Sequence, residues 1–149
     1  MGSNPTSSVL KKMKNKYLKK ILFCLIIIFI FLLLYLFVPF SDSLRRILFP
    51  FFAILGLLFL LFGIILLVFS KKEKGRLKTF LILTGISAIS PLLFTVLHNL
   101  FYGLSMAFEN YKALFEWFHA LFFIISIIIS PIIFIIGIIG SMILLKNKH

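Results

Sequence analysis

Four long apolar runs, separated by short polar or basic segments, constrain this 149-residue chain more than any other feature of its sequence. They cover about residues 21–40, 47–70, 79–104 and 119–145. A helix of about 20 apolar residues crosses the hydrocarbon core of a bilayer while satisfying its own backbone hydrogen bonds. The short connections force neighbouring spans to run in opposite directions. The pattern therefore predicts an all-α fold, a single integral membrane domain (1–149) built as an antiparallel four-transmembrane-helix bundle.

The composition is that of a membrane protein, with 62% hydrophobic residues, 13% charged residues and 20 phenylalanines. A net charge of +12 could indicate nucleic-acid binding, but the Lys and Arg residues lie almost wholly between and outside the apolar runs. We therefore expect the lipid bilayer as partner, with other membrane subunits or further copies of the chain, and no nucleic acid. The single Cys24 forms no CxxC spacing, so no redox or zinc motif is predicted.

The distribution of basic residues predicts the orientation in the membrane. With a cytoplasmic N-terminus, thirteen Lys and Arg lie inside, in a basic tail (1–20), in residues 71–78 and after the last span. Three lie in the outer connections: Arg45, Arg46 and Lys112. Such a bias over short loops sets orientation. We expect a multi-pass protein of the cell membrane with both termini cytoplasmic, and an outer loop (104–118) that is either a short amphipathic surface helix or a helical extension.

The third run is the only one with a polar face. At 100° per residue, one side carries Thr84, Ser87, Pro91 and Thr95, and the opposite side is aliphatic. A polar stripe inside a membrane faces other helices or water. Pro91, like Pro131 in the fourth run, follows a serine and leaves a helical carbonyl without its N–H partner, which predicts a kink. The kinks could open a polar cavity at the midplane, as broken helices do in transporters, or they could be ordinary packing kinks.

Small residues predict where the helices approach one another closely, because Gly, Ala and Ser let helix backbones come together in lipid. One such stripe lies on the second span and a second lies on the fourth. The stripe of the fourth span is expected to pack against the polar face of the third, so spans three and four should be the closest pair. The predicted packing residues are Ala53, Gly56 and Gly63, then Ser126, Ser130, Gly137, Gly140 and Ser141.

A cluster of polar residues is expected at the outer end of spans three and four. Histidines and carboxylates together could bind a metal ion, and two histidines on adjacent helices could ligate a haem. They could also relay protons, or simply hydrogen-bond the outer loop and fix the hairpin. The spacing is diagnostic of none of these, so no metal or other cofactor is predicted. The cluster is His98, Asn99, Tyr102, Glu109, Glu116 and His119.

No residue pattern indicates an enzyme. The chain offers no nucleophile with a base and an orienting group, no glycine-rich phosphate loop, and no acidic residue in the middle of a span. The sequence therefore favours a non-enzymatic structural or accessory subunit of a membrane complex. The alternatives are a small oligomeric transporter or ion- or proton-conducting protein that uses the polar face of the third span, and a metal- or haem-binding membrane protein.

The second half of the chain carries LTGISAISPLLFTVLHNLFYGL and SPIIFIIGIIGSMILL. These stretches resemble small prokaryotic four-span membrane proteins, in which TG-S-A leads into LHNL-Y and the fourth helix carries P-x-x-F-x-x-G-x-x-G-S. The likeness implies a fold and no particular activity. It covers the second half of the chain only, since the first half shares nothing with these proteins beyond its hydropathy. The matching residues are Thr84, Gly85, Ser87, Ala88, Leu97, His98, Asn99, Leu100, Tyr102, Pro131, Phe134, Gly137, Gly140 and Ser141.

Overall fold

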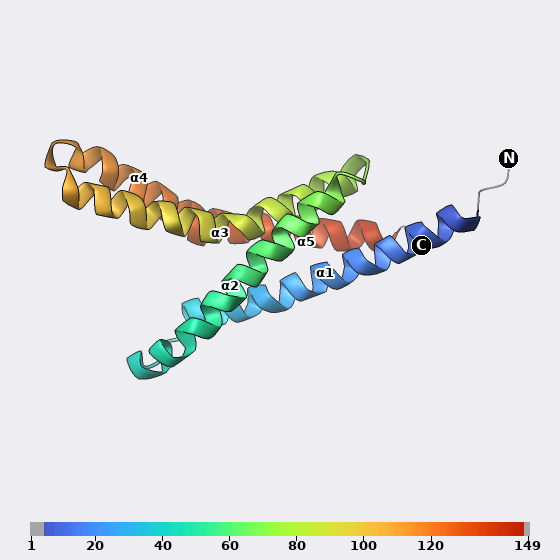
Figure 1. Cartoon of the computed structure of the whole chain (residues 1–149), viewed down its shortest axis with the longest axis horizontal. Coiled ribbons are helices and arrows are strands. Elements are labelled where there is room, and N and C mark those ends of the chain that lie inside the picture. Colours follow the sequence, from blue (N-terminus) through green and yellow to red (C-terminus); the bar gives the residue numbers. More distant parts are fainter. Residues whose placement is uncertain (1–4, 148–149) are drawn as a thin grey trace.

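The computed structural model describes residues 5–147, apart from the side chains of residues 5–8 and 10–12, and these residues are helical almost throughout (Figure 1). The elements are α1 (Pro5–Phe37), α2 (Asp42–Ser70), α3 (Gly75–Ala107), a 3-10 turn (Glu109–Tyr111), α4 (Lys112–Ile124), a π-helical turn (Ile125–Ile129) and α5 (Ser130–Lys146). Four helical stretches are long and apolar enough to cross a membrane, the fourth being the continuous Glu109–Lys146. The prediction of an all-α chain with four candidate spans is therefore confirmed for the described residues.

The boundary between the first two helices differs from the prediction. Helix α1 ends at Phe37, three residues before the expected boundary, close to Pro39, which cannot donate a helical hydrogen bond. The side chain of Ser41 accepts a hydrogen bond from the Leu44 N–H and caps α2, which therefore starts at Asp42 instead of residue 47. The early start also changes the positions of the two arginines of the connection and of Pro50.

Arg45 and Arg46 were expected in the outer connection, but they lie in the first turns of α2. The early start also places Pro50 inside α2 and not in its first turn, where its missing N–H would cost nothing. Its ring therefore removes a hydrogen bond to the carbonyl of Arg46 within the helix.

The basic segment predicted as a tail (1–20) is part of helix α1 from Pro5 onward. The Lys14 Nζ lies 2.6 Å from Glu73 Oε1 and donates a hydrogen bond to the Lys72 carbonyl at 3.1 Å, which ties α1 to the turn between α2 and α3. Leu18, one helical turn further on, is fully buried. These contacts explain why the helix extends beyond the apolar run. The prediction for residues 1–4, for the Lys11 and Lys12 side chains and for Lys148 lies outside the described residues.

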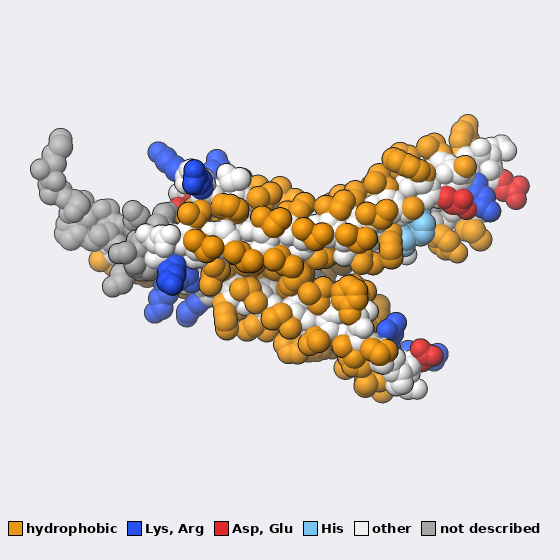
Figure 2. Space-filling model, turned by 180° about the vertical axis from the view of Figure 1, so that it is seen from behind, with side chains coloured by type: hydrophobic (Ala, Val, Ile, Leu, Met, Phe, Trp, Pro, Cys, Tyr) orange, Lys and Arg blue, Asp and Glu red, His pale blue; other side chains and the backbone are white. Residues whose placement is uncertain are grey.

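Helix α3 is the central element, since it packs against α2, α4 and α5, while α1 packs against α2 and α5. The buried apolar side chains come from α1, α2, α3 and α5, and α4 has no buried residue. At the far end the α1–α2 pair separates from the α3–α4 hairpin, so the molecule forms a fork (Figures 1 and 2). Apolar side chains cover the middle of the molecule and charged ones lie toward its ends, as a bilayer requires (Figure 2).

Glycines set the close contacts at the joined half of the fork. A β-carbon on Gly63 would lie 2.9 Å from the Gly85 carbonyl oxygen, so α2 and α3 meet there backbone to backbone. A β-carbon on Gly137 would lie 2.7 Å from Thr84 Oγ1 and 2.8 Å from the Thr84 nitrogen, so α5 meets α3 in the same way. Gly140 likewise sits against the ring of Phe80. Small residues therefore let these helices approach closely, and the resulting van der Waals contacts hold them together in lipid.

Candidate functional site

The two histidines of the predicted outer cluster meet on the α3–α4 arm. Their rings are stacked, with centroids 3.8 Å apart and an angle of 20° between the planes. His98 Nδ1 lies 3.0 Å from the His119 carbonyl oxygen, and His119 Nδ1 lies 3.1 Å from the His98 carbonyl oxygen. Since a carbonyl oxygen only accepts, each Nδ1 must carry a proton and donate it. The neutral rings are therefore Nδ1–H tautomers, and this reciprocal pair fastens α4 to α3.

The other members of the predicted cluster do not converge on the histidines. The Tyr102 ring lies beside the His119 ring, with centroids 5.3 Å apart. Asn99 turns back along α3 and donates to the Thr95 carbonyl. Glu109 is exposed, and Glu116 pairs only loosely with Lys112, at 4.0 Å. The carboxylates lie further out along the hairpin than the histidines, and neither Glu109 nor Glu116 forms a hydrogen bond or ion pair with them among the described residues.

Neither a metal site nor a haem site fits this geometry. Within residues 5–147 no group of three or more His, Cys, Asp or Glu side chains could hold a metal ion. A haem held by both histidines would have to lie between the two rings, but rings stacked at 3.8 Å leave no space for a macrocycle. The geometry of His98 and His119 favours the structural interpretation, in which they fix the hairpin.

A second polar group lies deeper in the molecule, where α3 meets the π-helical turn. The Ser126 hydroxyl donates a hydrogen bond of 3.0 Å to the Pro91 carbonyl oxygen and lies 3.1 Å from Thr95 Oγ1. Because a serine hydroxyl has one proton, Thr95 is then the donor to Ser126. The π-helical turn was not predicted. It ends just before Ser130-Pro131, where Ser130 donates to the Ile125 carbonyl, so the missing proline N–H is accommodated by a wider turn rather than by a simple kink.

The N-terminal part of the predicted polar face, which carries Thr84 and Ser87, serves packing. Thr84 and Ser87 are buried, and their hydroxyls donate to carbonyls of their own helix, those of Phe80 and Leu83. Thr84 is also the residue against which Gly137 packs. Ser141 is buried, and its hydroxyl has no hydrogen-bond partner among the described residues. The polar stripe of α3 therefore does not continue as an open path through this half of the molecule.

The predicted packing stripe of α2 divides in two. Gly63 is buried in the α2–α3 contact, but Ala53 is exposed and a β-carbon on Gly56 would meet nothing within 4 Å. The prediction that Ala53 and Gly56 pack against another helix is therefore wrong, because α2 has already diverged from α3 at their level. Gly56 instead lines a cleft.

This cleft lies in the fork between α1, α2, α3 and the start of α5, and its volume is about 380 Å³. Leucine, phenylalanine and proline side chains make up most of its wall. The polar side chains that line it are Thr95 and Ser126, from the pair described above, and Tyr35, near the C-terminal end of α1. The cleft is thus an apolar space with two hydroxyls at one place and a phenol at another.

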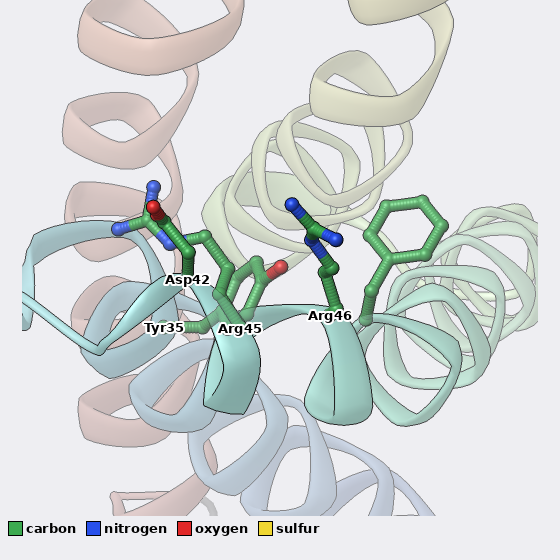
Figure 3. Close-up of a pocket in the computed structure, with 5 residues that line it drawn as sticks. Tyr35, Asp42, Arg45 and Arg46 are labelled. Carbon is green, nitrogen blue, oxygen red and sulfur yellow. The ribbon is translucent and has the colours of Figure 1, made fainter.

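A second cavity, also of about 380 Å³, shares Tyr35 with the cleft (Figure 3). Its other lining residues are Asp42, Arg45, Arg46 and Phe49 from the start of α2. The Arg45 guanidinium carbon lies 6.0 Å from the centre of the Tyr35 ring. We call this cavity the mouth. Sequence reasoning missed it, although two adjacent arginines on the side with few basic residues were a usable signal.

Comparison of the chain with protein-family models, with curated proteins and with solved structures finds no match.

Proposed function

We propose that this chain is a non-enzymatic, multi-pass accessory protein of a cell membrane that holds the acyl chain of a membrane lipid in the cleft of its fork. Within this proposal the helices form an antiparallel bundle, both termini are cytoplasmic, and the mouth faces the outer surface. The observation that carries the proposal is the cleft between the two arms, with its apolar wall and its volume of about 380 Å³.

The wall of the cleft explains why a lipid chain suits it. Apolar walls that face a gap lose van der Waals contacts, and an acyl chain restores those contacts without leaving a polar group unpaired. The volume also lies within the range of small-molecule sites, roughly 300–1,000 Å³. The hydroxyls of Thr95 and Ser126 are already bonded to each other and to the Pro91 carbonyl, so they demand no polar ligand.

Conduction through a single copy of the chain is less well supported by the same contacts. A conducting path along α3 would have to pass Thr84 and Ser87, which are buried and bonded within their own helix. Gly137 closes the space beside Thr84. Within this proposal, the inner half of the polar face of α3 serves helix packing, and its outer half lines the lipid cleft.

Two glycines offer a matched test of the cleft. A β-carbon on either Gly56 or Gly103 meets nothing within 4 Å, but only Gly56 lines the cleft. We expect Gly56→Leu to fill the cleft and to lower severalfold the lipid that native mass spectrometry detects on protein purified in a mild nonionic detergent. Gly103→Leu should retain lipid like the unchanged protein. Equal lipid retention by the two variants would contradict the proposed function.

A further inference from the structure

We propose that the mouth recognises the phosphate of an anionic phospholipid, through Arg45 and Arg46, while the acyl chain of the same lipid lies in the cleft. This inference rests on the proposed function of the cleft. It adds the chemical class of the lipid, which the cleft alone does not determine.

The first argument is continuity. Tyr35 lines both the apolar cleft and the charged mouth, so the two spaces adjoin at the end of α1. A phospholipid has the same arrangement, since an apolar chain is joined to a charged head. Tyrosine is common at this depth because its ring sits in apolar surroundings and its hydroxyl reaches the polar layer.

The second argument is charge. The mouth holds two guanidinium groups and one carboxylate, that of Asp42 (Figure 3). The ion pairs between described residues are Lys14–Glu73 and Lys112–Glu116, so neither arginine is neutralised by a carboxylate within 4.0 Å. Positive charge therefore predominates in the mouth, and an anionic group offsets it.

The third argument is the type of cation. A guanidinium is planar and offers paired N–H donors that match two oxygens of one phosphate, which a lysine ammonium does not. The Tyr35 ring lies at 6.0 Å from the Arg45 guanidinium carbon, within the range of a cation–π contact, and so holds Arg45 at the junction with the cleft. The Arg46 side chain makes no hydrogen bond, ion pair or ring contact with another described residue, which leaves its guanidinium donors free for a ligand.

The test compares two lipids with identical acyl chains. Purified protein in nonionic detergent is mixed with phosphatidylglycerol or with phosphatidylcholine, and retained lipid is counted by native mass spectrometry. We expect the unchanged protein to prefer phosphatidylglycerol. The double variant Arg45→Gln/Arg46→Gln should lose about tenfold in phosphatidylglycerol retention, as removal of charge-assisted hydrogen bonds implies. It should lose less phosphatidylcholine, because the phosphate of that lipid is already offset by its own choline cation. Lys112→Gln, an exposed basic residue on the other arm, is the control and should change nothing.

Folding of the variants is checked by circular dichroism and by the midpoint of thermal unfolding. If the double variant does not fold, Arg46→Gln alone replaces it, because the exposed Arg46 side chain makes no hydrogen bond, ion pair or ring contact with another described residue. Equal retention of the two lipids by the unchanged protein, or an equal loss in Lys112→Gln, would overturn the inference. If retention is insensitive to the arginines but still falls in Gly56→Leu and not in Gly103→Leu, the headgroup inference is wrong and the cleft function stands. If Gly56→Leu and Gly103→Leu also retain equal amounts of lipid, both the headgroup inference and the proposed function of the cleft are wrong.

Discussion

His98 and His119 each donate a hydrogen bond to the backbone carbonyl of the other, across a pair of rings whose centroids are 3.8 Å apart. The contact is therefore reciprocal, and each histidine holds the backbone to which its partner is attached. Beside it, the Phe101 ring of α3 packs against the rings of Phe118 and Phe122 on α4. The histidine pair adds directed hydrogen bonds to this aromatic contact between the two helices of the hairpin.

The histidine pair predicts energetic coupling. We expect His98→Ala and His119→Ala each to lower the free energy of unfolding by about 1 kcal/mol, in line with hydrogen bonds between membrane helices. The double variant should lose clearly less than the sum of the two, because either substitution already breaks the stack. Unfolding in mixed micelles with increasing sodium dodecyl sulfate measures these values. Strict additivity would show that the rings do not act as a unit.

The contact between Gly137 and Thr84 predicts a large difference between two glycines. Gly137→Ala should destabilise the protein by about 2 kcal/mol or more, since its β-carbon would lie 2.8 Å from the Thr84 nitrogen and backbone cannot move aside cheaply. Gly103→Ala meets nothing within 4 Å and should stabilise α3 by up to about 1 kcal/mol, because alanine is the better helix former. The midpoint of thermal unfolding should therefore fall for the first and hold or rise for the second. Similar midpoints would contradict the close approach of α3 and α5.

The Lys14–Glu73 pair predicts that the basic N-terminal segment contributes to stability. Glu73 is 8% exposed and lies 2.6 Å from Lys14, so Glu73→Gln should cost about 1–2 kcal/mol. Glu116→Gln is the control, since that carboxylate is more than half exposed and 4.0 Å from its lysine, and it should cost less than about 0.5 kcal/mol. Chemical unfolding of both variants tests the difference. An equal loss of unfolding free energy in the two variants would show that the Lys14–Glu73 contact does not stabilise the protein.

The packing of Thr84 and Ser87 predicts that the protein does not conduct ions as a single chain. Liposomes containing the protein and a pH-sensitive dye should show the same proton leak as protein-free liposomes, and Thr95→Val or His98→Ala should leave that leak unchanged. A flux that depends on either residue would instead support the conducting alternative, in which the polar face of α3 lines a pathway between copies of the chain.

The sequence predicts the parts of this fold that depend on local composition. Four apolar runs are enough to place four helices, and the helical period is enough to put Thr84, Ser87 and Thr95 on one face. The predicted topology also grouped His98 with His119 as candidates, because it places both at the same end of the third and fourth spans. Whether they meet depends on the register of the hairpin, and that register leaves Glu109 and Glu116 beyond the histidines.

The fork could not be predicted, because small residues indicate that helices can approach but not where they separate. Gly56 and Gly63 belong to one stripe, yet Gly63 lies against Gly85 and Gly56 faces the cleft. The π-helical turn could not be predicted from the sequence for a similar reason. A Ser-Pro pair predicts a missing hydrogen bond, whereas the choice between a kink and a wider turn depends on what Ser126 reaches on α3.

The central claim is that a lipid chain lies between the two arms, and photolabelling tests it most directly. Protein reconstituted in vesicles with a phospholipid that carries a photoactivatable diazirine at mid-chain is illuminated, digested and mapped by mass spectrometry. The account predicts labels at the cleft, on Leu33, Gly56 or Leu92, above those on the exposed Ile64 and Ile139, and loss of the cleft labels in Gly56→Leu. Uniform labelling of all lipid-facing helices, unchanged by Gly56→Leu, would contradict it.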